Sequence, residues 1–211
     1  MNYTSISLEK NPLITVKVAT GHFATTSAHF NMYLEMGELK YASKKARAIA
    51  RELSLPYLTT TLIDTIVCVE GTEVLGAYLA EELTKSGPSL INFDEDVYVI
   101  TPAHSTDKKL IFRDNLQEMI KGKNVLLLVA STIGGRTIDS TLECIAYYGG
   151  KVVGISCLFA ASLGKFEGKV NAVFTGDDVP GYVAYPPENC ELCKSEHKLD
   201  AIVTSEGYAK I

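Results

Sequence analysis

Residues 125–137, which read Val-Leu-Leu-Leu-Val-Ala-Ser-Thr-Ile-Gly-Gly-Arg-Thr, constrain the fold of this chain more than any other segment. The apolar first half is too short for a helix and is typical of a buried strand, and it runs directly into a turn with two glycines. A helical pattern begins at Thr137, places Ile138 and Ile145 on one face, and ends at a second pair of glycines. This segment therefore predicts a strand, a tight loop and a helix in direct succession.

A strand, a glycine loop and a helix N-terminus together form a geometry that binds phosphate. The unpaired backbone N–H groups and the helix dipole point at the same spot. The loop has neither the Gly-x-x-x-x-Gly-Lys-Ser/Thr spacing nor the Gly-x-Gly-x-x-Gly spacing of common nucleotide-binding motifs. A tight turn without a ligand therefore explains this segment alone equally well, and the rest of the chain has to decide.

Further apolar strands alternate with helical patterns along the chain. Strands are expected at residues 13–19, 64–69, 97–100, 125–130, 152–160, 172–174 and 201–203, and helices at residues 39–53, after residue 73 and from residue 137. Strands that are apolar throughout and alternate with helices predict an α/β fold, a mostly parallel twisted sheet flanked by helices. Residues 20–33 show little periodicity, and residues 102–115 form a polar connection.

Two loops with glycines follow strands of this predicted sheet, one after Val69 and one after Ala130. Ligands of such sheets bind beyond the carboxyl ends of the strands. Two loops rich in backbone N–H groups, side by side, suit a ligand with two phosphate groups. For the first loop there is a simpler alternative, in which Thr72 caps the following helix and Glu73 complements its dipole.

Length and composition set limits on the class of protein. The 211 residues suit one sizeable domain with elaborations. A net charge of −5, with no basic cluster beyond residues 44–47, gives no support to a nucleic-acid partner. The chain has no membrane-spanning apolar run and no signal peptide, so no membrane partner is expected. Five cysteines without a secretion signal favour reduced thiols in the cytoplasm.

The order of these motifs resembles the type I phosphoribosyltransferases, and most of all their orotate phosphoribosyltransferase branch, over nearly the whole chain. Residues 64–80 resemble the pyrophosphate loop of that family with its flanking elements, and residues 121–137 resemble its ribose-5-phosphate loop. Residues 147–155 resemble the helix end and strand that follow. We expect a single domain over residues 1–211, with an N-terminal hood segment (1–38) and a cysteine-containing C-terminal extension (180–211).

The resemblance implies transfer of a phosphoribosyl group from 5-phosphoribosyl 1-diphosphate (PRPP) to a nitrogenous base, orotate by resemblance. It implies Mg²⁺ bound with PRPP, and a homodimer because the family usually forms one. The 5-phosphate is assigned to Ser131, Thr132, Ile133, Gly134, Gly135, Arg136 and Thr137, and the pyrophosphate to Glu70, Gly71, Thr72 and Glu73. The base pocket is assigned to His29, Asn31 and Tyr33 in the hood, with Tyr182 and Tyr185 as further candidates. Lys108 or Lys109, in the polar connection that corresponds to a mobile catalytic loop, is assigned to catalysis. For single polar residues of the hood and the connection, a turn or a solvated surface is the plainer alternative.

The chain departs from the family motif at two acidic positions before the phosphate loop, which are Val129 and Ala130 here. In the family these acids hold the ribose hydroxyls and stabilise the positive charge of an oxocarbenium-like transition state. The sequence therefore predicts phosphate binding with weaker sugar recognition, with Glu70 as a partial replacement. Three functions stay open: a phosphoribosyltransferase, a regulatory phosphoribosyl- or nucleotide-binding protein without catalysis, and a nucleotide-processing enzyme of changed reaction type.

Cys190 and Cys193 form a C-x-x-C motif that His197 follows. Two thiolates at this spacing bind Zn²⁺, and a structural zinc site takes four ligands. His197 is the local third candidate, and the neighbouring sequence offers no fourth. A structural knuckle with or without Zn²⁺ and a pair of reduced, uncoordinated thiols both fit the sequence.

Overall fold

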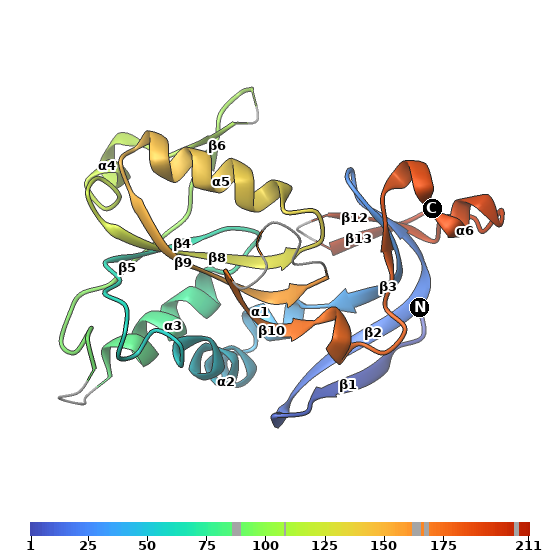
Figure 1. The fold of residues 1–211 in the computed structure, drawn as a ribbon, viewed down its shortest axis with the longest axis horizontal. Helices are drawn as coiled ribbons and strands as arrows, with labels where there is room; N and C mark the ends of the chain where they lie inside the picture. Colours follow the sequence, from blue (N-terminus) through green and yellow to red (C-terminus); the bar gives the residue numbers. More distant parts are fainter. Residues whose placement is uncertain (86–89, 108, 162–165, 167–168, 205–206) are drawn as a thin grey trace.

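The computed structural model of the chain describes residues 1–85, 90–107, 109–161, 166, 169–204 and 207–211. Over these residues it contains a five-stranded sheet between helices and a six-stranded sheet beside it (Figure 1). The first sheet is entirely parallel, which confirms the predicted α/β fold with a parallel sheet flanked by helices.

The parallel sheet has the strand order β10-β9-β8-β4-β5. Its strands are β4 (Thr65–Cys68), β5 (Tyr98–Ile100), β8 (Asn124–Thr132), β9 (Lys151–Ala160) and β10 (Val170–Thr175). The central strand β8 is buried from residue 125 to residue 130, because helices cover both of its faces. Since β4 pairs with β8, the loops that follow these two strands leave the same edge of the sheet.

Helices α2 (Ser43–Ser54) and α3 (Glu73–Thr84) cover one face of this sheet, and α5 (Arg136–Tyr147) covers the other (Figure 1). On the first face, Ile49 and Leu79 belong to one continuous core cluster. On the second, Ile138 and Ile145 of α5 share a core cluster with β8. The helical spacing of these residues explains why each helix buries one face.

The helix expected over residues 39–53 is interrupted. A short helix, α1 (Gly37–Tyr41), precedes α2, and Ala42 between them takes an extended conformation (φ −78°, ψ 112°). The interruption turns Lys40 inward, where its Nζ donates a hydrogen bond of 2.9 Å to the backbone oxygen of Glu70. The prediction of one continuous helix was wrong, because Ala42 leaves the helical conformation between α1 and α2.

The second sheet is built from both ends of the chain, and we call it the terminal sheet. It comprises β1 (Thr4–Leu8), β2 (Asn11–Ala24), β3 (His29–Glu35), β11 (Ala184–Tyr185), β12 (Ala201–Thr204) and β13 (Gly207–Lys210). Its order is β11-β3-β2-β12-β13, with β1 paired to β2. Residues 20–33, which the sequence leaves without regular structure, form the end of β2, a turn and most of β3. The strand expected at residues 201–203 joins this sheet and not the parallel one.

The polar connection over residues 102–115 contains a two-stranded hairpin, β6 (Ala103–His104) and β7 (Leu110–Ile111), and reaches α4 (Asp114–Gln117). A last short helix, α6 (Glu191–Lys194), carries the C-x-x-C motif. Within the described ranges, no helix combines the length and apolar character that a bilayer crossing requires.

Candidate functional site

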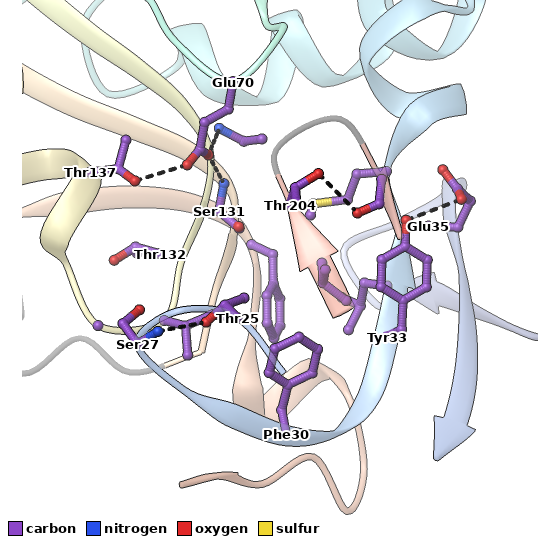
Figure 2. Close-up of a pocket in the computed structure, with 18 of the residues that line it drawn as sticks. Thr25, Ser27, Phe30, Tyr33, Glu35, Glu70, Ser131, Thr132, Thr137 and Thr204 are labelled. Carbon is purple, nitrogen blue, oxygen red and sulfur yellow. Dashed lines mark hydrogen bonds between the residues drawn. The ribbon is translucent and has the colours of Figure 1, made fainter. Parts of the chain in front are cut away.

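A cavity of about 390 Å³ lies where the carboxyl edge of the parallel sheet meets the terminal sheet (Figure 2). A cavity of this size suits a small-molecule ligand. One wall is the loop between β8 and α5 together with Glu70. The other wall comes from the terminal sheet and its surroundings, with Thr25, Ser27, Phe30, Met32, Tyr33, Glu35, Tyr182, Val203 and Thr204 among its residues.

All seven residues assigned to the 5-phosphate line this cavity, from Ser131 to Thr137. The loop ends at Gly135, which immediately precedes α5 and has a φ of +74°, a conformation that glycine adopts without strain. The first backbone N–H groups of α5 have no partner within the helix, and Arg136 adds a cation at its first residue. Backbone donors, the helix dipole and a guanidinium therefore all meet at this wall of the cavity.

The carboxylate of Glu70 joins the two loops. Its Oε2 accepts hydrogen bonds of 3.2 Å from the backbone N–H groups of Ala130 and Ser131, and its Oε1 accepts one of 3.0 Å from the Thr137 hydroxyl (Figure 2). Glu70 has a φ of +60°, which is uncommon for a residue other than glycine. A carboxylate therefore lies in the cavity beside Ala130, one of the two positions where the family motif has an acid.

The other position of that pair lies elsewhere. Val129 is fully buried in the core cluster beneath α5, whereas Ala130 lines the cavity. An acid at position 129 would have no water around it in this structure. The side chain of Glu70 is thus the carboxylate that the structure places against this part of the loop.

The rest of the first loop does not line the cavity. Thr72 is fully buried, and its hydroxyl donates to the backbone oxygens of Val69 and Leu128 at 2.9 and 3.1 Å, so it neither caps α3 with its side chain nor faces a ligand. The Glu73 carboxylate accepts a hydrogen bond of 2.9 Å from Thr101. Gly71 has a φ of +73°, and a Cβ there would lie 2.5 Å from the Tyr41 hydroxyl oxygen. Of the four residues assigned to the pyrophosphate, Glu70 is the one that the structure places in the cavity wall.

Lys40 is a cavity residue that the sequence did not reveal. Its side chain is buried, lines the cavity, and lies with its Nζ 5.1 Å from the centre of the Tyr41 ring. In the sequence, a lysine in a helical pattern is indistinguishable from one on a solvated face. A buried ammonium group at this position favours an anionic ligand, because burial strengthens its field.

The opposite end of the cavity is aromatic. The rings of Phe30 and Tyr182 lie nearly parallel with centroids 6.4 Å apart, and Phe159 meets Tyr182 edge-on at 5.0 Å. The Tyr33 hydroxyl donates to Glu35 at 3.3 Å, and burial, aided by the nearby Glu35 charge, raises the pKa of Tyr33. Burial also raises the pKa of Tyr182. Both tyrosines therefore present neutral phenols at neutral pH.

Two of the three residues assigned to the base pocket lie elsewhere. Tyr33 lines the cavity, but Asn31 bridges β3 to the segment before β11, donating to the Gly181 oxygen at 2.7 Å and accepting from the Val183 N–H at 2.8 Å. His29 lies beside His22, with 3.1 Å between ring nitrogens. Both are held by partners from distant segments, which the sequence alone does not pair with them.

The two lysines assigned to catalysis belong to the connection between β6 and β7. Lys109 is exposed, and its backbone pairs with Ser105 in the hairpin, away from the residues that line the cavity. Lys108 lies outside the described residues. Lys109, the one of the two that the structure describes, is therefore not among the residues that line the cavity.

Cys190 and Cys193 lie together, but the side chain of His197 is not their neighbour. Their sulfur atoms face His22 and His29 of the terminal sheet. His197 contributes its backbone oxygen, which lies 2.7 Å from His22 Nδ1. The side chains that converge on the two cysteines are therefore those of His22 and His29, from the other end of the sequence, and not that of His197.

Comparisons with known proteins agree with this architecture. No protein-family model matches the chain. An orotate phosphoribosyltransferase of Chlorobium phaeobacteroides is 24% identical over 186 residues, which cover 86% of each chain. The structure of UMP synthase from Leishmania donovani superposes with a TM-score of 0.58 at 18% identity, over 90% of this chain but 37% of that one. Mycobacterium tuberculosis orotate phosphoribosyltransferase, in complex with inorganic phosphate, gives a TM-score of 0.50 at 12% identity over 83% and 88% of the two chains.

The resemblance seen in the sequence is thereby confirmed at the level of the fold and of a distant sequence relationship. The chain has the fold of the type I phosphoribosyltransferases.

Proposed function

We propose that this protein transfers a phosphoribosyl group from PRPP to a planar nitrogenous base, with orotate as the first candidate. The observation that carries the proposal is the cavity itself, which has a phosphate-binding loop at one wall and aromatic rings at the other. The sequence relationship to an orotate phosphoribosyltransferase supports this choice of base.

In the proposed complex the 5-phosphate binds the loop of residues 131–137, and the diphosphate binds near Lys40. The base packs against Phe30 and Tyr182. The buried hydroxyl of Tyr182 has no hydrogen-bond partner among the described residues, so it is available to a ligand. A ring nitrogen of the base attacks C1 of the ribose. The bond from C1 to the diphosphate oxygen breaks, the diphosphate leaves with the bonding electrons, and the proton of the ring nitrogen passes to the departing diphosphate.

A bound Mg²⁺ ion would neutralise negative charge on the leaving diphosphate. Among the residues that line the cavity, Glu35 and Glu70 offer the carboxylate oxygens that Mg²⁺ prefers. Both oxygens of Glu70 already accept hydrogen bonds from the loop, so we expect Glu70 to contact the ion through water.

In the proposed reaction, Glu70 partly replaces the two acids that the family motif has at positions 129 and 130. Positive charge develops on the ribose in the transition state, and a carboxylate held by fixed donors stabilises it without reorganising. We expect Glu70→Gln to lower kcat by about 100-fold with a small change in KM for PRPP. Glu73→Gln is the matched control, because this carboxylate lies three residues further on, at the start of α3, and accepts a hydrogen bond from Thr101. Equal effects of the two substitutions on kcat would contradict the role given to Glu70.

The direct test is to incubate the protein with PRPP, Mg²⁺ and a panel of purine and pyrimidine bases, and to measure pyrophosphate release. Release with one base identifies the substrate. No release with any base would reject the transferase.

A second candidate is a PRPP- or nucleotide-binding protein that lacks catalysis. It is favoured by Val129 in the core and by the apolar Ala130, since neither can hold ribose hydroxyls. Calorimetric binding of PRPP without pyrophosphate release from any base would support this candidate.

Three remaining expectations stand as proposals. The ligand is a small molecule, and neither nucleic acid nor membrane takes part. The homodimer rests on the resemblance, and light scattering of the purified protein tests it. A cytoplasmic location is compatible with five free thiols.

A further inference from the structure

Four side chains converge outside the cavity lining, where the start of α6 meets β2 and β3. They are His22 of β2, His29 of β3, and Cys190 and Cys193, at the start of α6 and within it. One nitrogen or sulfur atom from each lies within 4.8 Å of those of the other three. Two imidazoles and two thiols are a common donor set for structural Zn²⁺.

The spacing of the four atoms matches a metal-centred tetrahedron. With Zn–N near 2.1 Å and Zn–S near 2.3 Å, neighbouring ligand atoms lie about 3.3 to 3.8 Å apart. Here His22 Nε2 is 3.1 Å from His29 Nδ1, and Cys193 Sγ is 3.3 Å from the same His29 nitrogen. Cys190 Sγ and Cys193 Sγ lie 3.5 and 3.7 Å from His22 Nε2. Three of these four edges fall in that range, and the fourth, between the two imidazole nitrogens, is slightly shorter.

The hydrogen bonds around His22 also favour metal binding by its ring. Its ring is buried, and Nδ1 lies 2.7 Å from the backbone oxygen of His197, to which it can only donate. That hydrogen bond leaves the lone pair of Nε2 directed at the cluster, which is the usual arrangement around a zinc-bound histidine. The backbone N–H of His22 donates to Asp200 at 2.8 Å, and the N–H of Asp200 donates to the His22 oxygen at 2.8 Å.

We propose that His22, His29, Cys190 and Cys193 bind one Zn²⁺ in a closed, four-coordinate structural site. Thiolate and imidazole donors favour zinc over Mg²⁺, and four protein ligands leave no open position for catalysis. The ion would fasten the segment that carries α6 to the hairpin of β2 and β3. Since Thr25, Ser27 and Phe30 of that hairpin line the cavity, the site would also steady one wall of the cavity.

The experiment starts with the full chain purified under reducing conditions without chelator, and measures its metal content by mass spectrometry. We expect about one zinc per chain. Replacement by Co²⁺ should give the intense visible absorption of a tetrahedral cobalt site and a thiolate-to-cobalt charge-transfer band. Less than a tenth of this zinc after incubation with equimolar Zn²⁺, or a Cys190–Cys193 disulfide in the reduced preparation, would overturn the proposal.

Single substitutions then identify the ligands. His29→Ala and Cys193→Ser change side chains that are not fully buried, so these variants should fold, and we expect zinc affinity to fall more than about 100-fold in each. His197→Ala is the matched control, because the exposed imidazole is not among the four donors and the backbone oxygen remains. Loss of zinc in His197→Ala together with full retention in His29→Ala would reject this ligand set. The metal content reports on this site whether or not the protein proves to be a transferase.

Discussion

The two sheets of this protein are stabilised in different ways. The parallel sheet uses strands from one continuous part of the chain, residues 65–175, and its central strand is buried on both faces. The terminal sheet joins strands from residues 4–35 to strands from residues 184–210, and several of its positions are exposed, such as Leu13 and Ile202. The parallel sheet packs against α5 on one face, and on the other it shares one apolar core with strands β1, β2 and β3 of the terminal sheet. The terminal sheet depends in addition on contacts between distant ends of the chain.

The two walls of the cavity differ in the same way: one comes from the parallel sheet and the other mainly from the terminal sheet. The wall that we propose binds phosphate is the loop between β8 and α5 with Glu70 against it, and the backbone path of the loop is local. The aromatic wall combines Phe30 from β3 with Tyr182 and with residues of β12. Phosphate binding should therefore tolerate changes in the terminal sheet, while selection of the base should depend on them. Four predictions test this contrast, from the largest expected effect to the smallest.

The largest effect should come from Leu127→Ala in β8. Leu127 is fully buried, so the cavity left behind should lower the free energy of unfolding by about 2–5 kcal/mol, measured by urea denaturation. Leu13→Ala in β2 is the matched control, since Leu13 is 84% exposed, and should stay within about 0.5 kcal/mol of wild type. Similar losses in both variants would remove the contrast between the sheets.

The second-largest effect should be that of Lys40→Met on the affinity for pyrophosphate. In Lys40→Met the ammonium group beside the cavity is lost, and a hydrogen bond from a charged donor contributes about 1.5–3 kcal/mol. We expect the affinity for inorganic pyrophosphate, measured by calorimetry, to fall at least about 10-fold. Lys44→Met, which removes an exposed lysine from α2, should bind pyrophosphate as wild type does. Unchanged affinity in Lys40→Met would place the diphosphate elsewhere.

Gly135→Ala tests the local geometry of the phosphate wall. A φ of +74° costs a residue with a Cβ about 1–2 kcal/mol, and this Cβ would lie 2.8 Å from Cε2 of Phe166. We expect the Kd for ribose 5-phosphate to rise about 5- to 30-fold. Gly122→Ala has the same backbone strain at a φ of +72° but no atom within 4 Å of the added Cβ, and it lies outside the cavity lining. Wild-type affinity in that control, with weak binding in Gly135→Ala, would locate the phosphate at this loop.

The smallest effect should be that of Phe30→Leu on the aromatic wall. Loss of one aromatic contact, about 0.5–1.5 kcal/mol, should raise KM for the base roughly 2- to 10-fold and leave KM for PRPP unchanged. Phe93→Leu, at an exposed phenylalanine outside the cavity lining, is the control. A larger change in KM for PRPP than for the base would reverse the assignment of the two walls.

Much of the parallel sheet followed from the sequence, because its signals are local. The run from Val125 to Ala130 predicted β8, and the glycines with the pattern that follows predicted the loop and α5. Lys40 and His22 were missed for a physical reason: each is defined by a partner far away in the chain, Glu70 in one case and Cys190 in the other. His22 and His29, seven residues apart around a hairpin turn, are the signal that, read together with the C-x-x-C motif, could have suggested four ligands.

By itself, the sequence determined the alternation of apolar strands and amphipathic helices, and with it a covered parallel sheet and a glycine loop at its carboxyl edge. Those features depend on periodicity and backbone preference within a few residues. Only the tertiary structure decided that the carboxylate of Glu70 lies against the loop at Ala130, and that the two ends of the chain share one sheet. Contacts of this kind join residues that are 60 or more positions apart, and pairing at such distances depends on the packing of the whole chain.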